Sequence, residues 1–330
     1  MKSSFVKVTV AVFLCLIFAW SLSQGKAMAF EPLKGNMSTF MPTKSVQITG
    51  DSIKIGLLNP FSGAAASSGE LFFLTMAWVA HDINSQGGIL VDGKEKKIQF
   101  ILGDTQVKPQ IANKVTERLI LEDKVDAIVG TSGTHITVIA QALAGKYKKV
   151  FVNNCSFSDL LLDKDNWNPY VFQACPNTTQ WMLAMGNFYS KRPEKKFYLL
   201  CQDYAYGHAI AEKFKEAIKK YKPEAQIVGE DFHAIFLKDF APYLTKIQAS
   251  GAEVIISSDW SADNENLVKQ SRQMGMKTPI ASIYVDDPNV LQTVGGPAGA
   301  GMVILQTNIP SINIPLNNKF NELWNAAWQK

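Results

Sequence analysis

The stretch that decides the fold runs from Asp126 to Asp159 and reads DAIVGTSGTHITVIAQALAGKYKKVFVNNCSFSD. Its pattern predicts two short buried strands, 127–130 and 150–153, each followed by a polar loop, with a helix from Ile136 between them. In a parallel α/β sheet, both loops leave the carboxyl ends of neighbouring strands, and such sheets bind ligands at that edge. The stretch therefore predicts a parallel sheet with a ligand site at the ends of its strands.

The first of these loops, 131–135, carries hydroxyl side chains beside the start of a helix. The unpaired N–H groups of a helix N-terminus attract an anion, and Ser132 and Thr134 add hydroxyl donors next to them. The alternative is that both residues only cap the helix and shape the turn. No base, nucleophile or metal-ligand set stands at a suitable spacing, and no cofactor motif is present. We therefore expect a site that holds a small carboxylate, not an enzyme.

The alternation of strands and helices predicts an α/β protein with two Rossmann-like lobes and a central ligand cleft. A strand–helix–strand–helix rhythm runs from Ile53 to Asp123, and a second one starts after Pro176. We expect the chain to be divided as follows: signal peptide 1–29, extended leader 30–50, first lobe 51–174 plus 308–330, and second lobe 175–307. The leader should be poorly ordered or lie on the surface.

The first residues have the pattern of a secretory signal. Lys2 and Lys7 supply the positive end, the apolar run Val8–Trp20 follows, and Ala27-Met28-Ala29 is a small-x-small cleavage site. We expect cleavage near Ala29 and an exported, soluble protein without a lipid anchor. Cleavage would remove Lys2, Lys7 and Lys26 from the 33 basic residues, leaving 30 basic against 29 acidic residues. A nearly neutral chain gives no electrostatic reason to bind nucleic acid or an anionic membrane.

Three cysteines remain after cleavage, Cys155, Cys175 and Cys201. An oxidising compartment permits a disulfide, and Cys155–Cys175 is the favoured pair because both residues follow strands near the expected cleft. The alternative is three buried free thiols. The four histidines are not at metal-ligand spacing, and we expect surface or capping roles for His81, His135, His208 and His233.

Motifs spread from Ile53 to the end of the chain carry a resemblance to a known family. They are Ile53-Lys54-Ile55-Gly56 with Ser62-Gly63, Asp82-Ile83-Asn84-x-x-Gly87-Gly88-Ile89, Asp203-x-x-Tyr206-Gly207, Lys269-Gln270-x-Arg272-x-x-Gly275, and Gly295 with Gly301-Met302. The chain resembles the periplasmic solute-binding proteins of ABC transporters, with the type I fold, of the leucine/isoleucine/valine-binding kind. The resemblance implies two lobes joined by a hinge.

The resemblance also implies which residues contact the ligand. In the first lobe these are Ser132, Thr134, Asn154 through its backbone, and Ser156; in the second lobe they are Tyr206, Trp260 and the adjacent Tyr204. The position of the acidic partner for a ligand ammonium group falls on Tyr284, with Asp286 just beyond. The ligand is therefore left open between an amino acid and a plain aliphatic or aromatic acid or amide.

The implied function is capture of a small carboxylate by hinge closure and its delivery to the membrane permease of an ABC transporter, by a monomer. The alternative is a periplasmic sensor of the same fold that reports its ligand to a signalling system. Members of the family continue beyond the position of Lys330, so we expect this chain to be truncated, with Trp324 and Trp328 left unburied.

Overall fold

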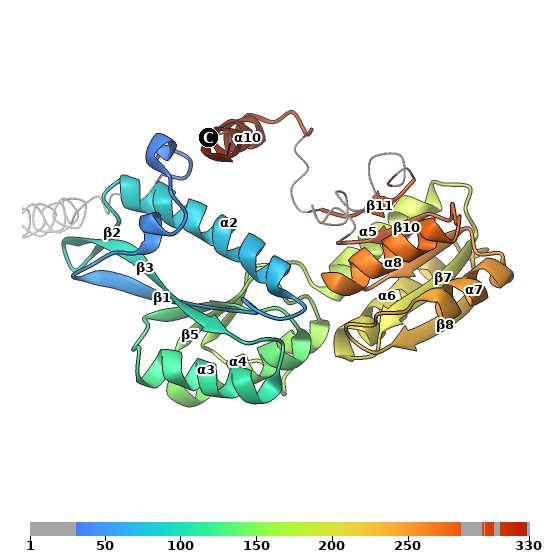
Figure 1. The fold of residues 1–330 in the computed structure, drawn as a ribbon, viewed down its shortest axis with the longest axis horizontal. Coiled ribbons are helices and arrows are strands. Elements are labelled where there is room, and N and C mark those ends of the chain that lie inside the picture. Colours follow the sequence, from blue (N-terminus) through green and yellow to red (C-terminus); the bar gives the residue numbers. More distant parts are fainter. Residues whose placement is uncertain (1–30, 285–298, 300, 307–310, 329–330) are drawn as a thin grey trace, which may run out of the picture. The chain divides into compact units, whose positions relative to one another are not determined.

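The computed structural model describes residues 31–284, 299, 301–306 and 311–328. Their strands form two separate sheets, one of six strands and one of five (Figure 1). The expected two-sheet α/β architecture is confirmed. The predicted lobe boundaries, 51–174 plus 308–330 against 175–307, stay a prediction. None of the helices in these residues is long and apolar enough to cross a membrane.

The first sheet has the strand order β2-β3-β1-β4-β5-β6. The strands are β1 (Ser52–Asn59), β2 (Ile89–Val91), β3 (Lys94–Asp104), β4 (Ala127–Gly130), β5 (Val150–Asn153) and β6 (Val171–Gln173). β4 pairs in parallel with β1 and β5, and β5 pairs in parallel with β6, whereas β2 and β3 form an antiparallel hairpin. The ends of β4 and β5 therefore lie side by side, as the sequence predicted.

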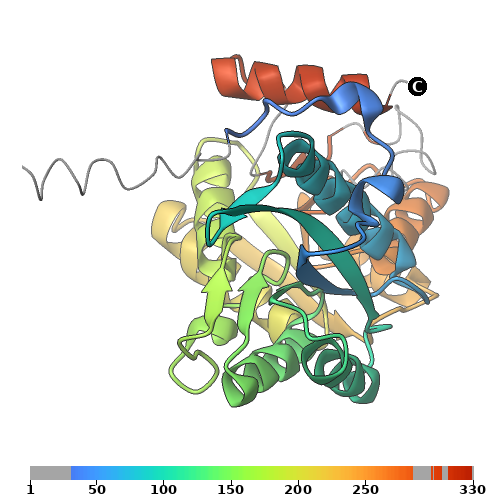
Figure 2. The ribbon, with the colours of Figure 1, turned by 90° about the vertical axis from the view of Figure 1, so that its left-hand side faces the viewer.

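Helices α3 (Pro109–Leu121) and α4 (Thr134–Tyr147) lie side by side on one face of this sheet (Figures 1 and 2). The core beneath them contains Leu58, Ile128 and Phe151 from neighbouring strands, each with no exposed surface. Because successive strand residues point to opposite faces, one residue from each strand reaches this core. The packing fixes the loops that leave β4 and β5.

The second sheet has the order β11-β10-β9-β7-β8, and all of its pairs are parallel. Its strands are β7 (Lys196–Gln202), β8 (Gln226–His233), β9 (Val254–Ser257), β10 (Ile280–Ser282) and β11 (Val303–Ile304). Buried parallel strands read as continuous apolar runs, and every residue of β7 except Lys196 is buried.

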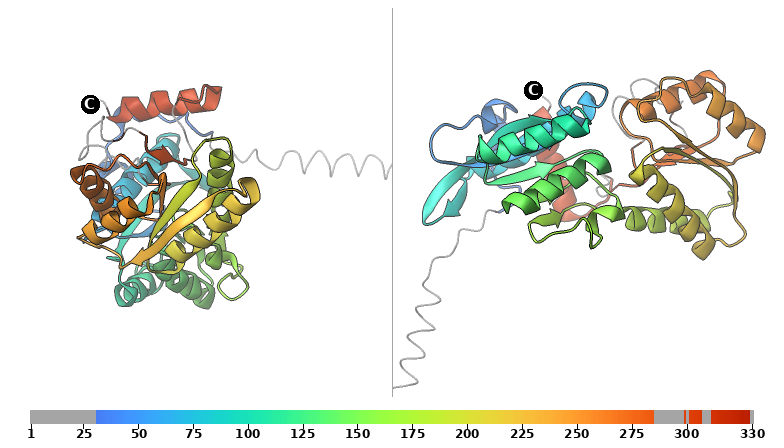
Figure 3. Two further views of the ribbon diagram at one scale, coloured as in Figure 1. Left: turned by 90° about the vertical axis from the view of Figure 1, so that its right-hand side faces the viewer. Right: turned by 90° about the horizontal axis from the view of Figure 1, so that it is seen from below.

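Among the described residues, four helices accompany this sheet: α5 (Thr178–Ser190), α6 (Ala205–Tyr221), α7 (Ala241–Ser250) and α8 (Ala262–Gln273). Alternate residues of β7 belong to two different cores. Phe197 and Leu199 pack with α5 and α6, whereas Tyr198 and Leu200 pack with α7 and α8. The two helix pairs therefore cover opposite faces of the sheet (Figure 3).

By contacts, residues 31–52, 77–98 and 319–328 form a small compact unit, and 53–76 and 99–318 form a larger one. In the small unit the leader is packed, not loose: it forms two 3-10 turns, η1 (Met37–Thr39) and η2 (Lys44–Val46), with Met37, Phe40 and Val46 buried. The Asp82 carboxylate fastens it by accepting the N–H groups of Leu33 and Gly35.

The small unit also contains most of helix α10 (Pro315–Trp328). Trp324 packs 5.7 Å from the ring of Trp78, and Trp328 packs edge-on to Phe40 at 5.2 Å. The expectation that Trp324 and Trp328 would be left unburied is therefore wrong, because the leader and helix α2 (Ala66–Ser85) provide aromatic partners.

Candidate ligand-binding site

The loop after β4 is held from the neighbouring strand. The side chain of Asn59 at the end of β1 accepts the Ser132 N–H at 2.9 Å. Gly133 is the N-cap of α4 with φ +89°, a conformation that favours glycine. Ser132 remains partly exposed, whereas Thr134 is only 2% exposed. The hydroxyl of Ser132 is thus the accessible one of the two that the sequence proposed.

The loop after β5 is organised by Asn153, which the sequence interpretation missed. Its Oδ1 accepts the N–H groups of Cys155 and Ser156, at 3.4 and 2.9 Å, and its Nδ2 donates to the Ser156 carbonyl at 2.7 Å. The Ser156 hydroxyl donates to the Thr131 carbonyl and lies 2.6 Å from Thr137 Oγ1. It joins the two loops within the protein instead of pointing at a ligand.

The three described cysteines are free thiols. The favoured Cys155–Cys175 pair is therefore not formed in this structure. Cys155 Sγ faces Ser132 Oγ at 4.0 Å, whereas Cys175 Sγ lies 3.5 Å from the Ser156 carbonyl oxygen. Burial raises the pKa of both thiols to about 12, so neither is ionised near neutral pH.

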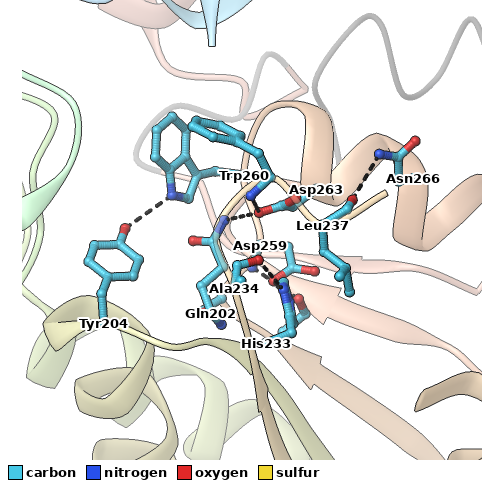
Figure 4. Close-up of polar contacts among 12 residues, drawn as sticks. Gln202, Tyr204, His233, Ala234, Leu237, Asp259, Trp260, Asp263 and Asn266 are labelled. Atoms are coloured by element: carbon cyan, nitrogen blue, oxygen red, sulfur yellow. Dashed lines mark hydrogen bonds and ion pairs between the residues drawn. The ribbon is translucent and has the colours of Figure 1, made fainter. Parts of the chain in front are cut away.

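An aromatic wall comes from the second sheet. Tyr204 is the N-cap residue of α6, and its hydroxyl accepts the Trp260 indole N–H at 3.0 Å (Figure 4). His135 of α4 meets the Tyr204 ring edge-on at 5.5 Å, and Tyr206 lies 5.9 Å from it. The two sheets therefore contribute to one place, where the Ser132 loop adjoins Tyr204.

The close packing of the backbone at Gly207 explains why a glycine follows Tyr206 in this wall. A Cβ there would lie 1.9 Å from the carbonyl oxygen of Gln202, so only glycine lets the first turn of α6 sit against the end of β7. Tyr206, 3% exposed, is nearly buried, and its hydroxyl has no hydrogen-bond partner among the described residues. Tyr204, only partly buried, is the tyrosine better placed for a ligand.

Behind this wall lies a buried polar network (Figure 4). His233 Nδ1 faces the Ala234 carbonyl at 3.0 Å, and Nε2 faces Asp259 Oδ1 at 2.9 Å, with neither side chain exposed. A carbonyl only accepts, so Nδ1 carries a proton. His233 and Asp259 then share one further proton and are together neutral. Burial lowers the pKa of His233, but the bond to Asp259 outweighs it and leaves that pKa raised.

Asp263 forms the second half of the network. Its Oδ2 accepts from Gln202 Nε2 at 2.6 Å and from the Phe236 N–H at 2.8 Å. Burial first, and the charge of Asp259 second, raise the pKa of Asp263 to about 6. Oδ2 of Asp259 and Oδ1 of Asp263 have no hydrogen-bond partner within the described part of the chain. The network adjoins Trp260 in sequence on both sides and holds the loop that presents it.

Two histidine predictions are wrong. His233 is buried in the network above, and His81, 7% exposed, packs against Phe40 and faces the Asn36 carbonyl at 2.9 Å. Asp259 beside His233, and Asn36 and Phe40 beside His81, come from distant sequence, so spacing alone gave no signal. Among the residues that the structure describes, no cluster of His, Cys, Asp or Glu has the geometry of a metal site.

A cavity of about 330 Å³ lies beside the loop after β5. The described residues that line it all belong to the larger unit: Asn154, Phe157, Ala174, Cys175, Pro176, Trp181, Ile283, Tyr284, Leu305 and Gln306. Asn154 and Tyr284 thus line the same cavity, and their contact with a ligand stays a prediction. Phe157 and Trp181 were missed, because each reads as an ordinary core aromatic. Asp286 lies outside the described residues.

Two sheets of mostly parallel strands, with polar loops at the ends of β4 and β5, define the class of protein: the type I periplasmic binding fold. The family model for periplasmic binding proteins matches residues 52–330, so the chain belongs to that family.

The individual relatives share low sequence identity with this chain. An amino acid binding protein of Pseudomonas aeruginosa is 27% identical over 254 residues, which cover 74% of this chain and 64% of that protein. The chain therefore spans just under two thirds of the length of that relative. A solute binding protein from R. palustris in complex with benzoate has a TM-score of 0.73 at 21% identity, covering 84% of this chain and 75% of that one.

A second solved structure shows the same fold with a different ligand. The branched-chain amino acid binding protein LivJ of Streptococcus pneumoniae, in complex with isoleucine, has a TM-score of 0.72 at 24% identity. The match covers 85% of this chain and 78% of that one. At these identities the two structures establish the fold alone.

Proposed function

We propose that this chain is the solute-binding component of an ABC transporter: a monomer that captures a small carboxylate outside the cytoplasm and delivers it to a membrane permease. One observation carries the proposal. The hydroxyl loop after β4 adjoins the aromatic wall of the second sheet, with His135 and Tyr204 5.5 Å apart. A ligand held at that loop therefore contacts side chains from both sheets.

Three kinds of group support a carboxylate in this position. Ser132 offers a partly exposed hydroxyl, and α4 begins directly after this loop, so its first N–H groups face the same place. The Tyr204 oxygen already accepts from Trp260, which leaves its own O–H free to orient as a donor. Each charge-assisted hydrogen bond contributes roughly 1.5–3 kcal/mol.

The relatives support the same chemistry. Isoleucine and benzoate, the ligands of the two solved structures, differ in size and in the ammonium group but share a carboxylate. In this proposal the loop after β4 and the start of α4 offer the donors for that common group. Thr134, Asn154 and Ser156 then shape the carboxylate site, while Tyr206 and Trp260 close it from the second sheet.

The mechanism is hinge closure. The lobe 51–174 plus 308–330 holds the carboxylate, and the lobe 175–307 brings Tyr204 and Trp260 over the rest of the ligand. Closure excludes water, which strengthens every hydrogen bond to the carboxylate. The signal-like segment 1–29, which lies outside the described residues, supports export with cleavage near Ala29. The protein carries out no chemistry on its ligand.

The test is calorimetric titration of the exported protein with a panel of carboxylates, alongside the variant Ser132→Ala. We expect that variant to weaken binding of the best ligand about tenfold or more without lowering the melting temperature, because it loses roughly one charge-assisted hydrogen bond. Ser190→Ala is the matched control, since that hydroxyl only donates to the Asn187 carbonyl at the end of α5. Unchanged affinity in Ser132→Ala would overturn the site.

A further inference from the structure

The residue after Trp260 has a strained backbone. Ser261 has φ +53° and ψ −133°, whereas Lys148, at the same φ of +53°, has ψ +41°, the ordinary left-handed conformation. The conformation of Ser261 lies outside the regions that residues with a side chain normally occupy, and it persists only where the surrounding structure fixes it. Strain of this kind is concentrated at ligand clamps and switch regions, so the contacts of the Ser261 side chain are informative.

The residues on either side of Ser261 are held from within the second sheet (Figure 4). Asp259 is paired with His233 at the end of β8, at 2.9 Å, and Asp263 accepts from Gln202 at the end of β7, at 2.6 Å. These bonds fix the backbone before and after Ser261. The direction of its side chain is therefore set by the second sheet itself.

Ser261 occupies the N-cap position of α8, but its hydroxyl is used elsewhere. Serine is a preferred N-cap residue because its oxygen accepts an N–H group of the first turn. The Ser261 side chain makes no such bond to the first turn of α8, all of which the structure describes. It reaches instead to the segment after β1 of the first sheet, where it donates to the Ala64 carbonyl at 3.3 Å and lies 3.4 Å from Ser67 Oγ.

The two contacts form a chain with one direction. A carbonyl only accepts, so the single hydroxyl proton of Ser261 goes to Ala64, and Ser67 donates its own proton to Ser261 Oγ. Both distances exceed the usual O–H···O length of about 2.7–2.8 Å, so each bond is weak and can be made and broken. Ala65, between the two partners, is 1% exposed and belongs to the same buried apolar cluster as Trp260.

We propose that Ser261 is the latch of hinge closure: a serine whose strained backbone holds its hydroxyl ready for Ala64 and Ser67, so that the closed form is stabilised by a contact that does not touch the ligand. The inference rests on the proposed function, because it assigns a residue to the closing step. A hydroxyl that is already oriented loses little freedom when the contact forms. The latch slows opening and hence ligand dissociation, whereas the ligand enters the open form before the latch is made.

Cross-linking tests the contact without a ligand. Ser67→Cys combined with Ser261→Cys places two thiols where the hydroxyl oxygens lie 3.4 Å apart, and a disulfide needs a close and specific approach of the two side chains. We expect diamide, which takes up the two hydrogens of the thiols, to form this bond roughly fivefold or more faster than in Ser68→Cys combined with Ser261→Cys. That second pair is the matched control, one residue along the chain. Peptide mass mapping separates the new bond from the native cysteines, and equal rates in the two pairs would overturn the proposal.

Two variants separate the hydroxyl from the backbone. Ser261→Ala removes the hydroxyl, and Ser261→Gly removes both the hydroxyl and the strain. We expect each to speed dissociation of the best-bound carboxylate of the panel about three- to tenfold in stopped flow, with the association rate changed less than about twofold. Ser261→Gly should melt at a higher temperature than Ser261→Ala, because glycine adopts a positive φ without strain. Dissociation at the parent rate, or a glycine variant that melts no higher than the alanine variant, would overturn the latch.

Ser67→Ala completes the test. In the parent it should speed dissociation about two- to fivefold, whereas in the Ser261→Ala background it should add nothing, because its acceptor is already gone. Additive effects of the two substitutions would overturn the proposal. A protein that cross-links between positions 67 and 261 but binds no carboxylate would instead refute the proposed function and leave the contact itself established.

Discussion

Two histidine–aspartate pairs with almost equal nitrogen–oxygen distances belong to the second sheet and its helices. His208 and Asp203 are 2.8 Å apart at the start of α6, with about half of each side chain exposed (52% and 63%). His233 and Asp259 are 2.9 Å apart, and neither side chain is exposed. The nitrogen–oxygen distances of the two pairs are thus nearly the same, whereas their burial differs completely.

Burial changes what each pair does. Water solvates the exposed pair whether or not its partners meet, so their attraction adds little to stability. The buried pair has no such substitute, and removing either partner leaves the other unsolvated. The buried pair also stands beside Trp260, so its integrity determines how the aromatic wall is presented. The following predictions test that difference.

The largest expected effect belongs to His233→Ala. It leaves Asp259 without its partner in the core and removes a ring that packs 4.9 Å from Phe240. We expect the free energy of unfolding to fall by about 3–5 kcal/mol at pH 7, measured by urea denaturation. A loss below about 1 kcal/mol would contradict the buried-pair interpretation.

Asn153→Ala perturbs a buried network of uncharged groups in the first sheet, for comparison with the ionisable network of His233 and Asp259 in the second. It removes three hydrogen bonds to the loop after β5, and we expect a loss of about 2–3 kcal/mol that is independent of pH. Asn187→Ala on the exposed side of α5 is the control and should be near neutral. A pH-dependent loss would show that the loop is coupled to a titrating group.

Asp263→Asn tests the pH dependence. The raised pKa of about 6 means that the folded state binds this proton more tightly than the unfolded state, whose pKa is near 3.8. Ionisation of Asp263 therefore removes stability as pH rises from about 4 to 6. Asn keeps the oxygen that accepts from Gln202 and Phe236, so we expect about 2 kcal/mol of relative stabilisation at pH 7.5 compared with pH 4. Parallel stability curves for variant and parent would refute this.

A second pH effect belongs to His233 itself. Its folded pKa is raised, so its contribution is fully present below the unfolded value near 6.5 and is lost as pH rises through the folded pKa. Stability should therefore decline further above pH 6.5 in the parent. His233→Gln, which cannot titrate, should lack this decline in thermal melts. Its persistence in that variant would assign the decline to another group.

The smallest expected effect is that of His208→Ala. This pair is exposed, so we expect the free energy of unfolding to change by no more than about 0.5 kcal/mol. Thermal melts of His208→Ala and His233→Ala, made side by side, measure the contribution of burial directly. Comparable losses of unfolding free energy in the two variants would show that burial does not distinguish the two pairs.

Much of the fold was predictable because local patterns carry it. The strands around Ile128 and Phe151, the helix between them and the polar loops at their ends follow from short-range periodicity and turn chemistry. The family resemblance named Tyr206 and Trp260 with the adjacent Tyr204, and in the structure the Trp260 indole N–H donates to the Tyr204 phenol oxygen. A strand before Cys175 was expected without bounds, because three residues are too short for a periodic signal, and the structure gives it as β6.

The site residues were predicted less completely, because side-chain direction depends on neighbours far along the chain. Ser156 was expected to contact the ligand, yet its hydroxyl is bound to Thr131 and Thr137. His233 was expected at the surface, yet a partner 26 residues away holds it in the core. Neither outcome is encoded within a window of a few residues.

The sequence by itself determined the alternation of strands and helices, the two sheets, the family, and the polar loop that carries Ser132, because spacing and residue type are local properties. Only the tertiary structure decided which hydroxyl stays accessible, which aspartate shares a proton with His233, and that Phe157, Trp181 and Tyr284 enclose one cavity. The physical reason is that burial and hydrogen-bond pairing are set by segments that meet in space, and both change the energy of a charge far more than its sequence neighbours do.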